Sequence, residues 1–262
     1  MIWIIVCLVA LGASGLTLFS GFGLGTLLLP AFAVVFPAEL AVAATAIVHL
    51  TNNLFKLALI GRHARFATVL AFGLPAVLGA LGGAWLLKSL SGLPVIGDYT
   101  VAGQRFEVSL LKIALGSLIV LFAWFELDPE SGSGHARRLG MRWGGLVSGF
   151  FGGLSGHQGA LRSAFLVGGG LDKEAFIATG VWCAAMVDVS RIAVYGLVFI
   201  GPLVAGSGEG PVGGLLLAAM FSAFAGAWIG VRMVRKVTLE GVRRWVGLLL
   251  ILVGLGLALG VV

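Results

Sequence analysis

Apolar segments alternate with short polar stretches along the whole chain. Most of these segments run for roughly 20 residues, the length at which a helix crosses a bilayer: residues 40–60, 66–87, 106–125, 175–200, 212–231 and 246–262. Two further apolar regions, residues 2–36 and 143–170, are interrupted by glycine-rich stretches at residues 20–25 and 155–159. The pattern predicts an all-α integral membrane protein with about eight to ten transmembrane segments, in which two helices are broken by glycine or re-entrant.

The composition supports this class. Of the 262 residues, 59% are hydrophobic and 11% are charged, whereas a soluble domain carries roughly 25% charged residues. The 42 glycines suit helices that pack closely in lipid. The net charge of +6 comes from Lys and Arg gathered in a few loops, which orients a membrane protein and does not indicate nucleic-acid binding. The first apolar segment lacks a basic leader region and is expected to be retained.

Patterns typical of enzymes and metal sites are not recognisable in the sequence. It contains no nucleotide-binding loop, no zinc-type spacing of histidines and no Ser/His/Asp arrangement. Cys7 and Cys183 both lie in apolar segments, so we expect neither a disulfide nor a metal site. The sequence therefore predicts a protein that is not an enzyme and that uses no cofactor.

The second half of the chain repeats the plan of the first half. The matches are Gly25 with Gly159 and Thr45 with Thr179 at an offset of 134 (159 − 25; 179 − 45), and Gly83-Ala84-Trp85 with Gly226-Ala227-Trp228 at an offset of 143 (226 − 83). Because the matches occur in the same order, they predict two repeats, residues 1–128 and 143–262, joined by a cytoplasmic linker over residues 129–142.

Charged loops indicate how the two repeats are oriented. Arg62 and Arg65 follow the third segment of the first repeat, which predicts a cytoplasmic position for that loop. The equivalent loop of the second repeat, residues 201–210, contains no Lys or Arg. Equivalent loops on opposite sides of the membrane mean inverted repeats. Both termini are then predicted on the outer side of the membrane.

Polar residues crowd into the second glycine-rich interruption, Gly156-His157-Gln158-Gly159-Ala160-Leu161-Arg162. An arginine is costly in a membrane, at roughly +2.5 to +3.5 kcal/mol at the centre of a helix. A broken helix frees backbone N–H groups and presents a partly positive N-terminus. Together with Arg162 these donors predict an anion site. The alternative is that Arg162 reaches to the surface and that the glycines only allow close packing.

The first interruption, around Ser20, Gly23 and Gly25, occupies the equivalent position. In transporters built from repeats, broken helices at equivalent positions form the substrate site near the middle of the bilayer. We therefore expect the site to lie between the two interruptions, where Ser155 and Gly159 flank the polar residues. A histidine changes its charge near physiological pH, so His157 would take up a proton with the anion, or would stay neutral and only donate a hydrogen bond.

Further polar residues lie within the segments at residues 40–60 and 175–200. Asn52 and Asn53 either line the site or bond neighbouring helices as structural glue, worth about 0.6–2 kcal/mol per contact. Lys56 either joins them or reaches to the surface. Asp188 and Arg191 are three residues apart and are expected to neutralise each other. The predicted substrate-binding residues are Arg162, His157, Gln158, Arg191, Asn52, Asn53, Ser20, Gly23, Gly25, Ser155 and Gly159, and the candidates for proton coupling are His157, His49, Lys56 and Asp188.

The first interruption also carries a family resemblance. It reads Gly21-Phe22-Gly23-Leu24-Gly25-Thr26-Leu27-Leu28-Leu29-Pro30, which resembles the glycine-rich, proline-ended stretch near the start of the sulfite exporter TauE/SafE family, the TSUP permeases. The length and the duplicated layout are similar too. The second copy lacks the proline and carries His157, Gln158 and Arg162 instead of further glycines. The resemblance implies a secondary transporter that moves sulfite, organosulfonates or similar small anions across a bacterial inner membrane.

Two other functions share the same features. An anion channel would differ only in that access does not alternate, and a carrier of small carboxylates would differ only in the anion that it binds. The partners expected from the sequence are a small anion and the lipid bilayer, and the sequence is compatible with a homodimer.

Overall fold

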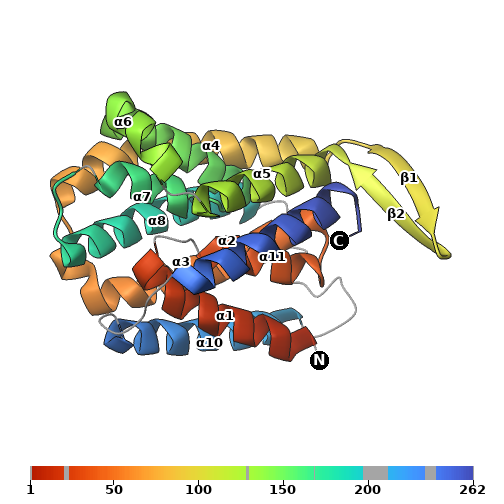
Figure 1. Ribbon diagram of the computed structural model, residues 1–262, viewed down its shortest axis with the longest axis horizontal. Helices are drawn as coiled ribbons and strands as arrows, with labels where there is room; N and C mark the ends of the chain where they lie inside the picture. The colour runs from red at the N-terminus through yellow and green to blue at the C-terminus, as the bar shows by residue number, and fades with distance from the viewer. Residues whose placement is uncertain are drawn as a thin grey trace.

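The computed structural model describes residues 2–20, 24–127, 130–167, 169–196, 212–233 and 240–261, and these are mostly helical (Figure 1). The helices are α1 (Ile2–Ser20), α2 (Leu24–Ala33), α3 (Ala38–Ile60), the short 3-10 helix η1 (Gly61–His63), α4 (Phe66–Ser91), α5 (Leu110–Leu127), α6 (Glu130–Ser155), α7 (Gly159–Val167), α8 (Lys173–Tyr195), α10 (Val212–Met233) and α11 (Glu240–Ala258). Strands β1 (Val95–Val101) and β2 (Gln104–Ser109) form a single hairpin.

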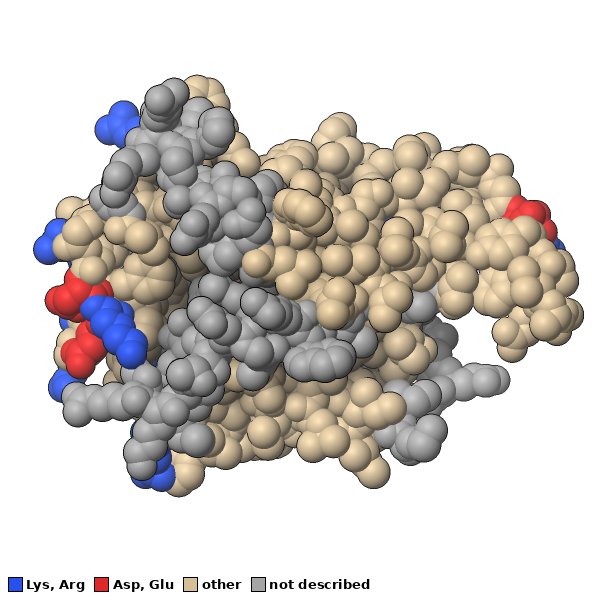
Figure 2. Space-filling model, in the orientation of Figure 1, with Lys and Arg blue, Asp and Glu red and all other residues tan. Residues whose placement is uncertain are grey.

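The helices are built to lie in a membrane. Within the described residues, α3, α4, α8 and α10 are long and apolar enough to cross a bilayer, and α1, α2 and α5 contain shorter apolar stretches. Figure 2 shows charged side chains at the two ends of the molecule, and on this face the described residues between the ends are uncharged. This arrangement confirms a multi-pass helical membrane protein, as the hydrophobic pattern predicts.

The helices that follow the two interruptions are too short to cross. Helix α2 has 10 residues and α7 has 9, so at a rise of about 1.5 Å per residue each is about half as long as the hydrocarbon core is thick. Each of these two helices therefore covers only part of the thickness of the membrane. The helices that come next, α3 and α8, run antiparallel, because Gly61 after the end of α3 accepts a hydrogen bond from Trp182, whereas the earlier His49 of α3 contacts the later Asp188 of α8.

Close helix pairs join the first half of the chain to the second. Helix α4 packs along α6, α1 along α10, α3 along α8 and α5 along α11. Glycines make these contacts possible, because a Cβ atom at each would overlap the backbone of the neighbouring helix. The examples are Gly79 and Gly83 against α6, Gly145, Gly149 and Gly153 against α4, Gly226 against α1, and Gly116 against α11. Backbone-to-backbone contact of this kind stabilises helix pairs in lipid.

Gly149→Ala is expected to destabilise the folded protein by about 1–3 kcal/mol, the usual cost of overpacking a close contact. A Cβ at this position would overlap the carbonyl group of Ala76 in α4. Gly12→Ala is the matched control, because no atom lies within 4 Å of a Cβ built there. Unfolding in mixed detergent measures both variants. Equal midpoints for the two would contradict the proposed role of the glycine contact.

Local residue types explain where several helices begin and end. Helix α3 begins directly after Pro37. Helix α8 begins after Asp172, whose side chain accepts a hydrogen bond from the Ala175 backbone N–H at 2.8 Å. Helix α6 ends at Ser155 and α7 begins at Gly159, as predicted for the second interruption. The predicted loop over residues 201–210 lies outside the described residues.

The prediction of a loop over residues 88–104 followed by a membrane span from residue 106 was wrong. Helix α4 continues to Ser91, and the hairpin then extends beyond the helices at the end of the molecule that also holds both termini (Figure 1). Positive φ angles at Ala102 and Gly103 make its tight turn, and Tyr99 donates a hydrogen bond to the Leu259 carbonyl at 2.7 Å. The hairpin also corrects the all-α assignment in this one region.

The predicted linker is partly helical. Helix α6 begins at Glu130 and includes much of the predicted linker, with non-helical backbone angles at Gly140 (φ 76°, ψ 164°). Glycine adopts a positive φ without the steric cost that other residues have, so the chain bends there before it enters the apolar part of α6. The division into two repeats and a linker stays a prediction.

Candidate functional site

The interruption between α6 and α7 lies inside the protein. Gly156 has a φ of 84°, in the left-handed region, and the residues from Ser155 to Gly159 are all buried. The Gln158 carbonyl accepts hydrogen bonds from the Arg162 N–H (2.9 Å) and the Ser148 hydroxyl (3.1 Å). The turn is thus held on both sides by α6 and α7, with its side chains directed into the interior.

The first turn of α2 contacts this interruption. A Cβ atom on Gly25 would lie 3.0 Å from the Gly156 carbonyl oxygen. The two glycine-rich stretches therefore meet, although they are 131 residues apart in the sequence (156 − 25). Gly23 and the side chain of Ser20, which are also predicted site residues, lie outside the part of the structure that is described.

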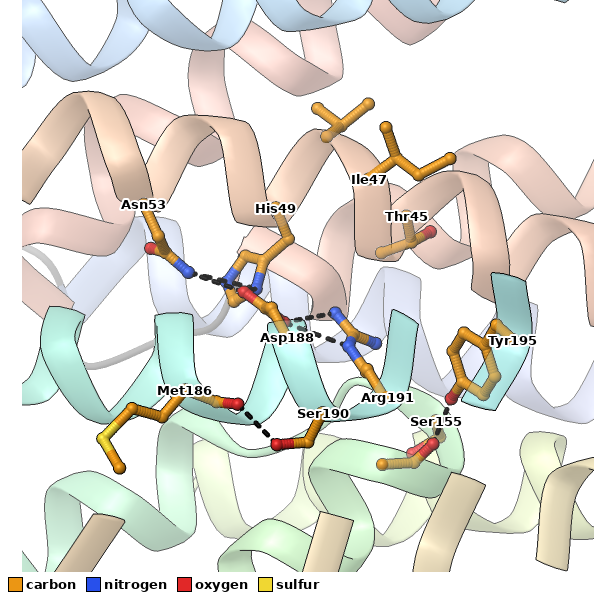
Figure 3. A network of polar contacts seen from close by, with 12 residues as sticks. Thr45, Ile47, His49, Asn53, Ser155, Met186, Asp188, Ser190, Arg191 and Tyr195 are labelled. Carbon is orange, nitrogen blue, oxygen red and sulfur yellow. Dashed lines mark hydrogen bonds and ion pairs between the residues drawn. The ribbon is translucent and has the colours of Figure 1, made fainter. Parts of the chain in front are cut away.

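A buried acid links the central helices α3 and α8 (Figure 3). Asp188 on α8 accepts hydrogen bonds through Oδ1 from Arg191 Nε (3.0 Å) and Nη2 (2.7 Å). Its other oxygen, Oδ2, accepts from Asn53 Nδ2 at 2.8 Å and lies 2.7 Å from His49 Nδ1, both on α3. The predicted pairing of Asp188 with Arg191 is confirmed, and the network extends to the first half of the chain.

Arg191 connects this network to the interruption. Its side chain is fully buried, and its Nη1 atom lies 2.8 Å from the position of a Cβ built on Gly156. The Nε and Nη2 atoms of the guanidinium group therefore bind Asp188, while Nη1 faces the turn between α6 and α7. A side chain at position 156 would occupy the space that this nitrogen uses.

Unpaired polar atoms gather around the interruption. Buried polar side chains are normally hydrogen-bonded. Among the described residues, however, His157 Nε2, Gln158 Nε2, Arg162 Nη1 and Arg191 Nη1 are buried without a hydrogen-bond partner. A guanidinium or amide nitrogen only donates, and a histidine ring nitrogen donates or accepts. The group that satisfies them must be rich in acceptors.

The Nη1 atom of Arg162 is buried, although the residue as a whole is only partly buried, so the tip of the side chain is directed into the protein. The side chain passes beside Gly180 of α8, with Nε 3.4 Å from a Cβ built there. Arg162 forms no ion pair within 4.0 Å with any acid in the described part of the chain, and it interacts with Asp188 and Lys56 only at longer range.

Lys56 is buried as well, at 4% exposure. In the amide orientation that satisfies its neighbours, Asn52 accepts a hydrogen bond from Lys56 Nζ at 3.1 Å and donates to the Ala223 carbonyl at 3.2 Å. Asn52 also contacts the Ser14 hydroxyl. Asn52 thus connects α3 to α1 and α10, as in the structural alternative predicted for it. It also binds the Lys56 ammonium group inside the protein.

The polar residues around the interruption form one cluster, which consists of His49, Lys56, His157, Arg162, Asp188 and Arg191. This cluster carries more positive than negative charge. Lys56, Arg162 and Arg191 contribute three cations and Asp188 one anion, so the sum is +2 with both histidines neutral (3 − 1). An excess of buried positive charge is strongly unfavourable in a low-dielectric interior unless an anion balances it. The electrostatics therefore favour an anionic ligand.

Two contributors were not predicted from the sequence. The Phe122 ring of α5 stacks on the His157 ring, with centroids 5.5 Å apart and planes inclined by 11°. The Tyr195 hydroxyl donates to the Gly153 carbonyl of α6. Tyr195 lies four residues after Arg191 and hence on the same face of α8. This spacing is the feature of the sequence that could have indicated Tyr195 as part of the site. Ser155, one of the predicted site residues, lies 3.0 Å from His157 Nδ1.

These features define a multi-pass membrane protein with a buried, positively charged cluster where two broken helices meet. The family model of the sulfite exporter TauE/SafE matches residues 6–257, and the chain belongs to this family. The resemblance noted in the glycine-rich stretch is thereby confirmed, and the protein is a membrane transport protein. No curated protein matches the chain.

Proposed function

We propose that the protein is a secondary transporter that moves small sulfur-containing anions, such as sulfite or organosulfonates, across a bacterial inner membrane. The observation that carries the proposal is the group of four unpaired nitrogen atoms on His157, Gln158, Arg162 and Arg191, in a cluster with excess positive charge. Sulfite and sulfonate groups present three oxygens, each of which accepts hydrogen bonds. A compact anion of this shape would satisfy these donors together.

Each side chain has a role in this proposal. Arg162 is the principal charge partner because the described residues give it no acid of its own. Arg191 adds one nitrogen while Asp188 holds the rest of its guanidinium group in place. His157 and Gln158 donate from the turn itself. Gly25 lets α2 approach the interruption closely, and Gly159 begins α7, so that both helices would present their N-terminal turns to the anion.

Alternating access is proposed to arise from inverted repeats. The helix contacts are reciprocal, because α4 of the first half packs on α6 of the second, and α1 of the first half packs on α10 of the second. The broken pairs α1–α2 and α6–α7 lead into helices that start at opposite ends of the molecule. Rocking of one half against the other would open the cluster to each side in turn.

The basic residues indicate the proposed orientation of the protein in the membrane. Arg62 and Arg65 lie at the end of the molecule where α8 begins, since the Arg65 backbone N–H donates to Thr179 of α8. Loops rich in Lys and Arg face the cytoplasm. The opposite end, which holds the hairpin and both termini (Figure 1), would then be periplasmic.

A ligand screen tests the proposed function. We expect sulfite, thiosulfate or a sulfonate to raise the unfolding temperature of the purified protein, because a ligand at about 100 times its Kd stabilises the folded state by about 2.7 kcal/mol. Small carboxylates and chloride are the comparison ligands. Stabilisation by carboxylates alone would support the carboxylate carrier instead. Uncoupled conductance of reconstituted protein, without saturable counter-flow, would support the channel.

A further inference from the structure

The His49 ring and the Asp188 carboxylate form a dyad inside the helix bundle, with 2.7 Å between Nδ1 and Oδ2. The same carboxylate also accepts hydrogen bonds from Asn53 and Arg191. Donors therefore surround both of its oxygens. A protonated acid would have to direct its own hydrogen at one of these donors, so the geometry requires Asp188 to be ionised.

The dyad fixes the tautomer of His49. Nδ1 must carry a hydrogen because it faces an ionised oxygen, which only accepts. In the neutral ring Nε2 is then the basic nitrogen. A carboxylate bonded to one nitrogen of an imidazole orients the ring and stabilises the imidazolium that forms when the second nitrogen takes a proton. His49 thus has the arrangement of a proton acceptor.

We infer that His49 binds the proton that accompanies the anion, and that Asp188 and Arg191 connect this proton to the anion site. The inference rests on the proposed function of the cluster as an anion site. In the step concerned, a hydronium ion of the solvent gives its proton to the free electron pair of His49 Nε2. One O–H bond breaks, one N–H bond forms, a water molecule leaves, and the charge of the cluster rises by one.

The surroundings of His49 couple the two ligands. The charged groups that act on it are Asp188 and Arg191 from α8 and Arg162 from α7, while Lys56 lies seven residues further along its own helix (56 − 49). Helix α2 carries no titratable residue, and the one charged residue of α10 is Arg232 in its last turn. The two arginines oppose a further positive charge on His49. A bound anion neutralises them, so each ligand strengthens the binding of the other.

His157 is built differently. Its Nδ1 faces the Ser155 hydroxyl at 3.0 Å, its ring stacks on Phe122, and it forms no ion pair with an acid within the described residues. These contacts suit a neutral ring that donates a hydrogen bond to the anion. Of the two alternatives for His157, the structure therefore favours the donor, and it assigns the proton to His49.

Calorimetry of the purified full-length chain tests the assignment. The probe is methanesulfonate, which keeps the same charge between about pH 5 and pH 8, the range in which histidines titrate. Measurements in Bis-Tris and in imidazole avoid sulfonate buffers, and the difference in heat between the buffers counts the protons taken up. We expect the parent protein to take up a proton on binding, and its affinity to fall by up to about tenfold per pH unit above the titration.

The variants separate the two histidines. His49→Gln should still bind methanesulfonate, but without proton uptake and with little dependence on pH. His157→Gln should bind more weakly and keep the proton uptake. His63→Gln is the control outside the cluster, because this ring is partly exposed and pairs with Glu174, and it should behave like the parent.

Several results would overturn the assignment. It is wrong if the parent binds methanesulfonate without proton uptake. This measurement does not depend on the folding of any variant. It is also wrong if His49→Gln keeps the parental proton uptake, or if His157→Gln alone abolishes it. A parent protein that binds none of the sulfur-containing anions would instead show that the proposed function has failed.

Discussion

Arg162→Lys is expected to weaken the binding of sulfite or a sulfonate by roughly 10- to 100-fold, the effect of losing about 1.5–3 kcal/mol in a charge-assisted hydrogen bond. The variant keeps the positive charge and loses the planar fork that suits the oxygens of such an anion. Arg162→Gln removes the charge as well and should bind still more weakly. Both should fold, because the described residues give Arg162 no ion pair to break.

The matched control is Arg62→Gln. Arg62 is exposed in η1, where its Nε–H donates to the neighbouring His63, so its removal changes the net charge equally without touching the cluster. Binding of methanesulfonate by calorimetry and the unfolding temperature without ligand are measured for all three variants. If both Arg162 variants bind with the affinity of the parent, Arg162 has only a structural role. A loss of affinity in Arg62→Gln of similar size would point to net charge and not to the site.

Local features of the fold could be predicted because each depends on a short stretch of sequence. The helix start after Asp172 requires a capping side chain, and the break at Gly156 requires a residue that tolerates positive φ. Both signals are visible in the residues themselves. The hairpin after α4 was missed because its polar residues suggested a loop, although Val95, Tyr99, Val101 and Phe106 have high strand propensity.

The candidate site could be predicted only in part. The break in α6–α7 and the pairing of Asp188 with Arg191 are local, so spacing alone indicates them. The approach of His49 and Asn53 to Asp188 joins residues more than 130 positions apart, and no periodicity in one helix says which face of another helix it meets. The depth of Lys56 was ambiguous for the same reason, since the partner that holds it, Asn52, is itself fixed by α1 and α10.

Asp188→Ala is expected to have the largest effect on stability, a loss of about 3–5 kcal/mol in the free energy of unfolding. Asp188 is fully buried and is the only acid within hydrogen-bonding distance of Arg191 in the described structure. Its removal leaves a guanidinium group in the interior with no opposite charge beside it. It also removes the acceptor for Asn53 and His49, so that two further donors lose a partner.

An exposed pair in the same chain provides the control. Arg105 and Asp98 on the hairpin lie 2.9 Å apart, but their side chains are 67% and 45% exposed. Because water screens such a pair, Asp98→Ala should cost no more than about 1 kcal/mol. Unfolding of both variants in mixed detergent gives the comparison. Similar losses for Asp188→Ala and Asp98→Ala would contradict the view that burial of the charge determines the cost.

A double variant separates stability from function. Asp188→Leu combined with Arg191→Met removes both charges and leaves apolar side chains of similar size, and such replacements of buried ion pairs are often neutral or stabilising. We expect it to recover part of the stability that Asp188→Ala loses, because no guanidinium group is left without an opposite charge, although Asn53 and His49 still lack their acceptor. It should nevertheless bind methanesulfonate at least 10-fold more weakly than the parent, because one donor of the proposed site is gone. Full recovery of binding together with stability would mean that the buried pair serves only the fold, and that Arg191 does not contact the anion.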